Sequence, residues 1–143
     1  MASADLDAAT EFALKFAAPR LRPALDLLAR VELDAPSLVC DLGCGTGQLT
    51  QLMAERWPAA RVVGVDSSAQ MLSRAAAEAP RDRIEWHRAD LAGWVPAAAG
   101  TLAPQLIYSN AALHWLPDHA TLLPRLVEAL APSGVLAVQM PRN

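Results

Sequence analysis

The feature that most constrains the fold is a short apolar run followed by three alternating glycines, at residues 38–47. The run Leu-Val-Cys-Asp-Leu predicts a buried strand, and Gly-Cys-Gly-Thr-Gly predicts a tight turn that opens a helix near Gly47. Glycine suits such a turn because a backbone without side chains lets a flat, charged small molecule come within hydrogen-bond distance. The following helix directs its free N–H groups and the positive end of its dipole toward the same place. The segment therefore predicts a ligand site at the carboxyl end of a buried strand.

The glycine spacing separates two classes of cofactor. A dinucleotide fingerprint is G-x-G-x-x-G, whereas this chain has Gly43, Gly45 and Gly47. Gln48 stands at the dinucleotide position. Asp41 lies two residues before the first glycine, where a carboxylate would repel a pyrophosphate but suits a ligand with an ammonium and a sulfonium group, such as S-adenosylmethionine. From the motif alone three interpretations stay open: the methyl donor, a nucleotide cofactor, and a glycine-rich turn without a ligand.

Composition narrows the function classes. The 143 residues suffice for one domain with a single core, and 53% hydrophobic content with a mean hydropathy of +0.20 argues against disorder. A net charge of −3 with scattered basic residues gives no footprint for nucleic acid. Without an apolar run of 18 residues or a secretion signal, we expect no membrane span and a cytoplasmic location. Cys40 and Cys44 lack further soft ligands nearby, which favours two reduced thiols over a metal site.

Strand and helix patterns alternate along the chain. We expect a single domain, with an N-terminal helical cover over residues 1–35 and an α/β core over residues 36–143. The predicted elements are helices at 7–18 and 23–31, strand 38–42, helix 47–56, strand 61–66, a helix capped at 66–68 that ends near 79, strand 84–88, strand 106–109, a helix over 116–130 that Pro124 breaks into two parts, and strand 135–140. This alternation implies right-handed crossovers and an open parallel sheet.

Polar side chains stand at the ends of four predicted strands. They are Asp41, Asp66, Asp90 and Asn110. In open α/β sheets ligands bind outside the carboxyl ends of the strands, near the point where the strand order reverses. The convergence of four independent strands on polar ends predicts one ligand site at this edge.

Several segments match a known family when taken together. They are R-x-R-P-A at 20–24, D-L-G-C-G-x-G at 41–47, R-W-P-A-A-R at 56–61, G-V-D-S-S at 64–68, S-N-A at 109–111, W-L-P-D-H at 115–119 and G-V-L-A-V-Q-M-P at 134–141. With them the chain resembles the class I S-adenosylmethionine-dependent methyltransferases, and is most similar to the trans-aconitate 2-methyltransferase family. The resemblance implies a Rossmann-like sheet of strand order 3-2-1-4-5 with helices on both faces.

The resemblance also implies roles at the site. Asp41 would bind the methionyl ammonium, Asp66 would accept both ribose hydroxyls, and Asp90 would accept the adenine amino group. Asn110 would lie under the amino-acid end of the donor. The implied donor-binding residues are Asp41, Gly43, Cys44, Gly45, Gly47, Asp66, Ser67, Met71, Asp90, Leu91 and Asn110. Each also has a simpler interpretation as a cap or turn residue, since Asp66 and Ser68 could merely cap the next helix.

The family implies methyl transfer to a carboxylate of a small polycarboxylic acid such as trans-aconitate, giving a methyl ester and S-adenosylhomocysteine. An ionised carboxylate needs no general base, so alignment is the main requirement and we expect no catalytic side chain. Arginine forks suit a polycarboxylate. The candidate acceptor-binding residues are Arg20, Arg22, His114 and Arg142, with solvated arginines and a packing histidine as the competing interpretation. Trp94 and Trp115 are expected to pack in the core or a lid.

The chain departs from the family in length. It ends after the predicted fifth strand, whereas the family continues through two more strands, a helix and an acceptor-binding segment. The fifth strand would then be an exposed apolar edge that favours self-association. Two alternatives to catalysis stay open: a non-catalytic donor-binding fragment or association module, and a nicotinamide-dependent oxidoreductase.

Overall fold

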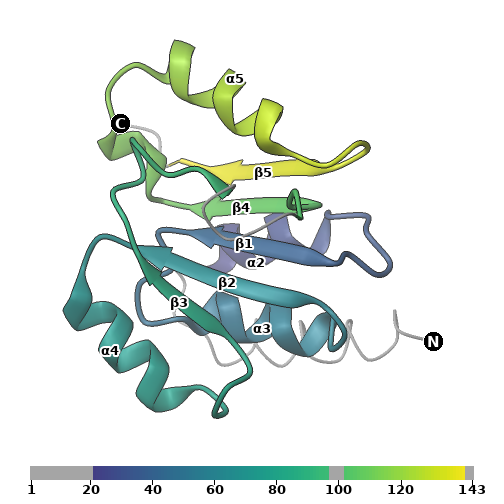
Figure 1. The fold of residues 1–143 in the computed structure, drawn as a ribbon, viewed down its shortest axis with the longest axis vertical. Coiled ribbons are helices and arrows are strands. Elements are labelled where there is room, and N and C mark those ends of the chain that lie inside the picture. Colours follow the sequence, from purple (N-terminus) through teal and green to yellow (C-terminus); the bar gives the residue numbers. More distant parts are fainter. Residues whose placement is uncertain (1–20, 97–101, 141–143) are drawn as a thin grey trace.

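The computed structural model describes residues 21–96 and 102–140 (Figure 1). Within them five parallel strands form one sheet in the order β3-β2-β1-β4-β5. The strands are β1 (Leu38–Leu42), β2 (Arg61–Asp66), β3 (Glu85–Arg88), β4 (Leu106–Asn110) and β5 (Val135–Gln139). The predicted open parallel sheet and its strand order are therefore confirmed. The helix predicted at 7–18, Arg20 and Arg142 lie outside the described residues.

The helices of the described part lie close to their predicted positions. They are α2 (Arg22–Ala29), α3 (Gln48–Arg56), α4 (Ala69–Glu78), the short 3₁₀-helix η3 (Leu113–Trp115) and α5 (His119–Ala129). α4 begins after Ser68, whose hydroxyl accepts the Met71 N–H at 3.2 Å, as the cap prediction required. None of the helices in residues 21–96 and 102–140 combines the length and apolar character that a membrane crossing requires. The expected cytoplasmic location stays a prediction.

The sheet separates two apolar layers because successive strand side chains point to opposite faces. One layer joins α2 and α3 to the sheet through residues such as Leu25, Met53 and Val39. These two helices lie behind the sheet in Figure 1. The other layer joins α5 and the loop at Trp94 to residues such as Ile107. Trp94 is buried there, which confirms its predicted packing role.

One predicted break is absent. We expected Pro124 to divide the last helix, but α5 runs unbroken from His119 to Ala129, with the proline inside it. Pro124 and Ala120 are both exposed. Proline removes the hydrogen bond that would reach the carbonyl four residues earlier, and here that carbonyl belongs to Ala120 on the solvent side. Water can therefore replace the missing partner. The helix also begins three residues later than predicted.

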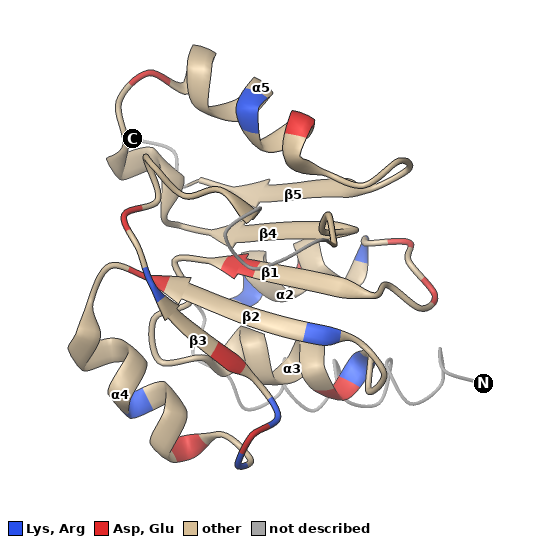
Figure 2. Ribbon diagram, in the orientation of Figure 1, with Lys and Arg blue, Asp and Glu red and all other residues tan. Residues whose placement is uncertain are grey.

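The register of the sheet aligns the carboxyl ends of its central strands. Asp41 on β1 pairs with Gly64 on β2 and with Tyr108 on β4. Figure 2 shows acidic positions at the carboxyl ends of β1 and β2. The Tyr108 hydroxyl, buried on the same face as Asp41, donates to the Ala24 carbonyl at 2.7 Å. This bond fixes α2 against the sheet, so that the residue just before α2 reaches the site described next.

Candidate functional site

The three glycines between β1 and α3 all adopt left-handed backbone, with φ of 78° at Gly43, 56° at Gly45 and 81° at Gly47. Added side chains would also collide at two of them. A Cβ at Gly43 would lie 2.3 Å from the Cβ of Ala112, and one at Gly47 would lie 2.6 Å from the Trp86 ring. Conformation and packing both require glycine there, so the predicted Cβ-poor turn is confirmed.

Strand β2 holds this glycine turn through three backbone N–H groups. Those of Gly43 and Cys44 donate to the Val65 carbonyl at 2.7 and 3.0 Å. The Gly45 N–H donates to Asp66 Oδ2 at 2.9 Å. Hydrogen bonds within the protein thus hold the turn in place, which lowers the conformational cost of binding a ligand there.

Asp41 is a buried carboxylate at the centre of the site. It is 2% exposed, and its Oδ2 accepts the Thr50 hydroxyl at 2.7 Å. In the part of the chain that the structure describes, Asp41 Oδ1 has no hydrogen-bond partner. Burial raises the pKa of Asp41 to about 7; the Thr50 bond lowers it in part, and the charge of Asp66 raises it further. A cation beside Asp41 would favour its ionised form.

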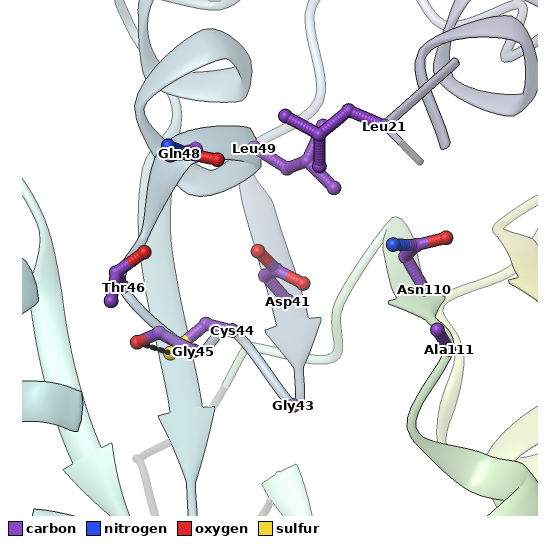
Figure 3. Close-up of a pocket in the computed structure, with 10 residues that line it drawn as sticks. All are labelled: Leu21, Asp41, Gly43, Cys44, Gly45, Thr46, Gln48, Leu49, Asn110 and Ala111. Carbon is purple, nitrogen blue, oxygen red and sulfur yellow. Dashed lines mark hydrogen bonds between the residues drawn. The ribbon is translucent and has the colours of Figure 1, made fainter. Parts of the chain in front are cut away.

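A first cavity of about 290 Å³ opens in front of Asp41. Figure 3 shows the Asp41 carboxylate and the Asn110 amide entering it from neighbouring strands, with the glycine turn on one side and Leu21 opposite. Its lining residues are Leu21, Asp41, Gly43, Cys44, Gly45, Thr46, Gln48, Leu49, Asn110 and Ala111. The cavity combines one buried acid, one amide and apolar walls, an arrangement that suits an amino-acid-like cation.

A second cavity of about 300 Å³ adjoins the first. It is lined by Gly43, Asp66, Ser67, Asp90, Leu91, Ala111, Ala112, Trp115 and Leu116. Gly43 and Ala111 line both cavities, so the two meet where the glycine turn approaches the chain after β4. Ala111 adopts left-handed backbone there, with φ of 53°, and its N–H donates to the Gln139 carbonyl at 2.8 Å.

The two acids of the second cavity retain free acceptor capacity. Asp66 Oδ2 accepts from the Gly45 N–H and Asp66 Oδ1 from the Ser68 N–H, both at 2.9 Å. Asp90 Oδ1 accepts from the Ala92 N–H at 3.0 Å. Each carboxylate oxygen has two acceptor positions. Of the simpler roles weighed from the sequence, Asp66 has that of a turn residue and Ser68 that of the cap of α4, yet the turn role leaves room at Asp66 for a ligand's hydroxyl or amino donors.

The structure brings together most of the predicted donor residues. Those that line a cavity are Asp41, Gly43, Cys44, Gly45, Asp66, Ser67, Asp90, Leu91 and Asn110. Gly47 and Met71 line neither cavity: Gly47 is the N-cap of α3, and Met71 is a 40% exposed residue of α4. Their predicted contacts with a ligand stay predictions, as do those of the other nine.

The predicted acceptor residues are less well placed. Arg22 is exposed on α2 and lines neither cavity. His114 is half-buried, with its ring 4.5 Å from that of Trp115 between ring centres. Within residues 21–96 and 102–140 no arginine lines either cavity. The described site therefore resembles the binding site of a cation more than that of a polycarboxylate.

Sequence reasoning missed several residues of the site, three of which bear on its chemistry. Thr50 is the hydrogen-bond partner of Asp41, and the signal was a polar residue within the buried face of α3. Leu21 lines the first cavity just before α2, which no local pattern indicated. Trp115 is 79% exposed and lines the second cavity, so of its two expected places, core or lid, the core is wrong and the lid stays a prediction.

The two cysteines are free thiols. Cys40 lies on β1, where its side chain is buried in the apolar layer shared with α5, and burial raises its pKa to about 12. Cys44 lines the first cavity, and burial raises the pKa of its thiol as well. Both thiols are therefore protonated at neutral pH and poor nucleophiles.

The fold and the site together define a Rossmann-like α/β domain with a ligand cleft at the carboxyl ends of its strands. A family model described as "Methyltransferase domain" matches residues 39–134, and the chain belongs to this family.

The curated relatives narrow the resemblance. The chain is 59% identical over 130 residues to a trans-aconitate 2-methyltransferase of Azoarcus sp. (strain BH72), a match that covers 91% of this chain and 49% of the relative. It is 57% identical over 129 residues to the Methylobacterium radiotolerans protein of the same name, covering 90% and 47%. The resemblance drawn from the sequence is confirmed. The chain spans about half the length of the curated relatives it matches.

Solved structures agree with the fold. A crystal structure of an S-adenosylmethionine-dependent methyltransferase from Mesorhizobium loti is 34% identical and superposes with a TM-score of 0.71, covering 85% of this chain and 53% of that one. A methyltransferase from Geobacter sulfurreducens, solved with S-adenosyl-L-homocysteine, is 21% identical with a TM-score of 0.64, covering 85% and 47%. At that identity the second likeness supports the fold alone.

Proposed function

We propose that this chain binds S-adenosylmethionine and supplies the donor-binding half of an O-methyltransferase that esterifies a small polycarboxylic acid such as trans-aconitate. One observation carries the proposal. The carboxylates of Asp66 and Asp41 and the amide of Asn110 lie at the ends of three adjacent strands, around a glycine turn with no side chains in the way. Relatives of 57–59% identity that are named for trans-aconitate support the acceptor class.

The first cavity fits the amino-acid end of the donor. An ammonium group beside Asp41 would meet a buried carboxylate with an unused oxygen, and it would repay the cost of ionising that carboxyl. Asn110 offers both a donor and an acceptor on the opposite wall. Uncharged ligands gain nothing from the ionised Asp41, so the cavity favours a cation.

The second cavity fits the adenosine end. The free acceptor positions of Asp66 suit the vicinal hydroxyls of a ribose, and Asp90 suits an exocyclic amino group. Because the two cavities meet at Gly43, one ligand can occupy both. The absence of a side chain at Gly43 lets that ligand pass close to the backbone.

The reaction asks little more of the protein than alignment. The donor supplies a methyl group on a sulfonium, already activated toward attack. Polycarboxylates are ionised at neutral pH, so the chain need not remove a proton from the nucleophile. Its residues hold the donor in one orientation, so that the methyl group can meet the acceptor in line, which is the effect of proximity. They also exclude water from one side of the donor. Arg20, Arg22, His114 and Arg142 stay predictions for the acceptor.

A direct assay tests the transfer. The protein, incubated with methyl-labelled S-adenosylmethionine and trans-aconitate, should yield a base-labile labelled ester. A panel of other di- and tricarboxylates tests the acceptor class. No ester with any of these acids, from a protein that binds the donor, would refute the transferase proposal and leave the non-catalytic donor-binding fragment.

An unpaired sheet edge favours a second candidate function, association. β5 pairs with β4, and in the described residues no strand pairs with its other edge. We propose that a second copy of the chain can add there, since an open edge offers unpaired backbone groups. Light scattering tests this: a concentration-dependent dimer supports association, and a monomer at all concentrations refutes it.

The alternative of a nicotinamide-dependent oxidoreductase loses its support, because the family match is to methyltransferases.

A further inference from the structure

Trp115 stands apart from the other tryptophans of the chain. Trp57 and Trp94 are buried, and Trp86 packs against the glycines of the turn and of β2. Trp115 is 79% exposed. Single exposed apolar residues are ordinary, so exposure alone means little. What singles out Trp115 is its place in the lining of the second cavity.

The backbone under Trp115 is firmly held although its ring is in water. The short helix η3 begins at Leu113, which is fully buried in the core. The Trp115 N–H donates to the Ala112 carbonyl at 3.3 Å, and the Leu116 N–H donates to the Leu113 carbonyl at 3.1 Å. The ring of His114 lies 4.5 Å from the indole, tilted by 42°. The indole is therefore presented to the cavity from a fixed base.

The remaining lining of this cavity defines what the indole could contact. Asp66 and Asp90 supply acceptor oxygens, and Leu91 and Leu116 supply apolar surface. A ligand bound here would meet carboxylates with its hydrogen-bond donors and an aromatic face with its ring or its positive charge. Indole faces attract both flat rings and cations. An adenosyl sulfonium carries all three features.

We propose that Trp115 covers the methyl donor in the second cavity and contributes to its affinity by direct contact. This inference rests on the proposed function, because it needs the donor to occupy that cavity. Contact with the ligand would also remove a large apolar surface from water, which adds to the binding free energy. The indole thus acts as a binding residue and takes no part in proton transfer.

Accessibility of Trp115 to a neutral quencher tests the proposal. Acrylamide should quench mainly Trp115, since the other tryptophans are buried or packed. Saturation with S-adenosylhomocysteine should lower the quenching constant of the wild-type protein by about half. In Trp115→Phe the same addition should change the quenching constant little, which assigns the signal to this residue.

Affinity provides the second measurement. Calorimetry should show that Trp115→Ala weakens S-adenosylhomocysteine binding about tenfold, whereas Trp115→Phe keeps most of the affinity. Val127→Ala is the matched control, because Val127 is also exposed and lines neither cavity. It should leave the affinity unchanged. The exposed position of Trp115 means that its variants should fold with near wild-type stability.

The outcomes separate two failures. If the wild-type protein does not bind S-adenosylhomocysteine, the proposed function fails and this inference fails with it. The inference alone is overturned by a different result, in which the wild-type protein binds S-adenosylhomocysteine. In that result the ligand leaves the quenching constant of the wild-type protein unchanged, and Trp115→Ala binds the ligand as tightly as the wild type does. A third result is that acrylamide quenching falls when the protein self-associates without ligand. That result would assign Trp115 to an interface between copies of the chain and would also overturn the inference.

Discussion

Thr50 donates a 2.7 Å hydrogen bond to the carboxylate of Asp41, and both residues are buried between α3 and β1. A single hydroxyl cannot replace the hydration that an ionised carboxylate loses on burial. Burial accordingly raises the pKa of Asp41 to about 7. The pair therefore holds a carboxyl group whose charge at neutral pH depends on what enters the first cavity.

The first prediction concerns stability and pH. Because the pKa of Asp41 is about 7 in the folded protein and ordinarily 3.8, the folded state binds more protons between these values. The contribution of Asp41 to stability should therefore fall as pH rises through this window and be lowest above it. Asp41→Asn removes the cost of ionising a buried carboxyl group, so at about pH 8 the variant should be more stable than the wild type by on the order of 2–4 kcal/mol. Near pH 4 the two proteins should unfold alike.

Urea unfolding at both pH values measures this difference. Asn keeps an oxygen that can accept the Thr50 hydroxyl, so packing is little changed. Equal pH dependence in the two proteins would contradict the burial argument. Asp26→Asn, at an exposed position on α2, is the control and should retain the wild-type pH dependence.

The second prediction concerns protons released on binding. S-adenosylhomocysteine carries an ammonium group that should ionise Asp41, so binding below the pKa releases a proton. Affinity should rise with pH by up to about tenfold per unit until it levels off near pH 7. Calorimetry in buffers of different ionisation enthalpy counts the protons directly. If binding still releases a proton near pH 6 in Asp41→Asn, another group is responsible for the release.

The third prediction compares two glycines of the turn. Gly45→Ala meets only the strain of left-handed backbone, since nothing lies within 4 Å of its added Cβ, and should cost about 1–2 kcal/mol. Gly43→Ala has the same strain and a Cβ 2.3 Å from that of Ala112, so it should cost about 1–3 kcal/mol more. Denaturant unfolding ranks the two. Equal costs would mean that the chain after β4 moves away freely.

The fourth prediction concerns Trp86 beneath the turn. A Cβ at Gly64 would lie 2.7 Å from the Trp86 ring and 3.1 Å from Cys44 Sγ. Gly64→Ala should therefore destabilise the wild-type protein by about 1–3 kcal/mol, and by less in a Trp86→Leu background. A double-mutant cycle of unfolding free energies measures the coupling. Strict additivity would place the strain elsewhere.

The parts of the fold that were predictable are those with a local cause. The strands at β1 and β2 follow from apolar runs buried on both faces, and the turn follows from three glycines in left-handed backbone, two of which also leave no room for a Cβ. Polar residues at strand ends meet because parallel strands share one carboxyl edge. That rule alone placed Asp41, Asp66 and Asp90 in adjoining cavities.

What escaped prediction depends on distant neighbours. Pro124 breaks nothing because Ala120 faces solvent, which only the orientation of α5 decides. Thr50 meets Asp41 across the interface of a helix and a strand. Trp115 lies in water because η3 directs its ring away from the core, although an aromatic residue beside Leu116 in sequence suggests packing.

The central claim is that Asp66 accepts the ribose of the methyl donor while it holds the glycine turn. Titration calorimetry of S-adenosylhomocysteine into the wild-type protein and Asp66→Ala tests it most directly, with Asp26→Ala as the matched control. We predict binding by the wild type and the control, and an affinity about a hundredfold lower in Asp66→Ala, since two charge-assisted hydrogen bonds are lost. Equal affinity in all three proteins would contradict the account.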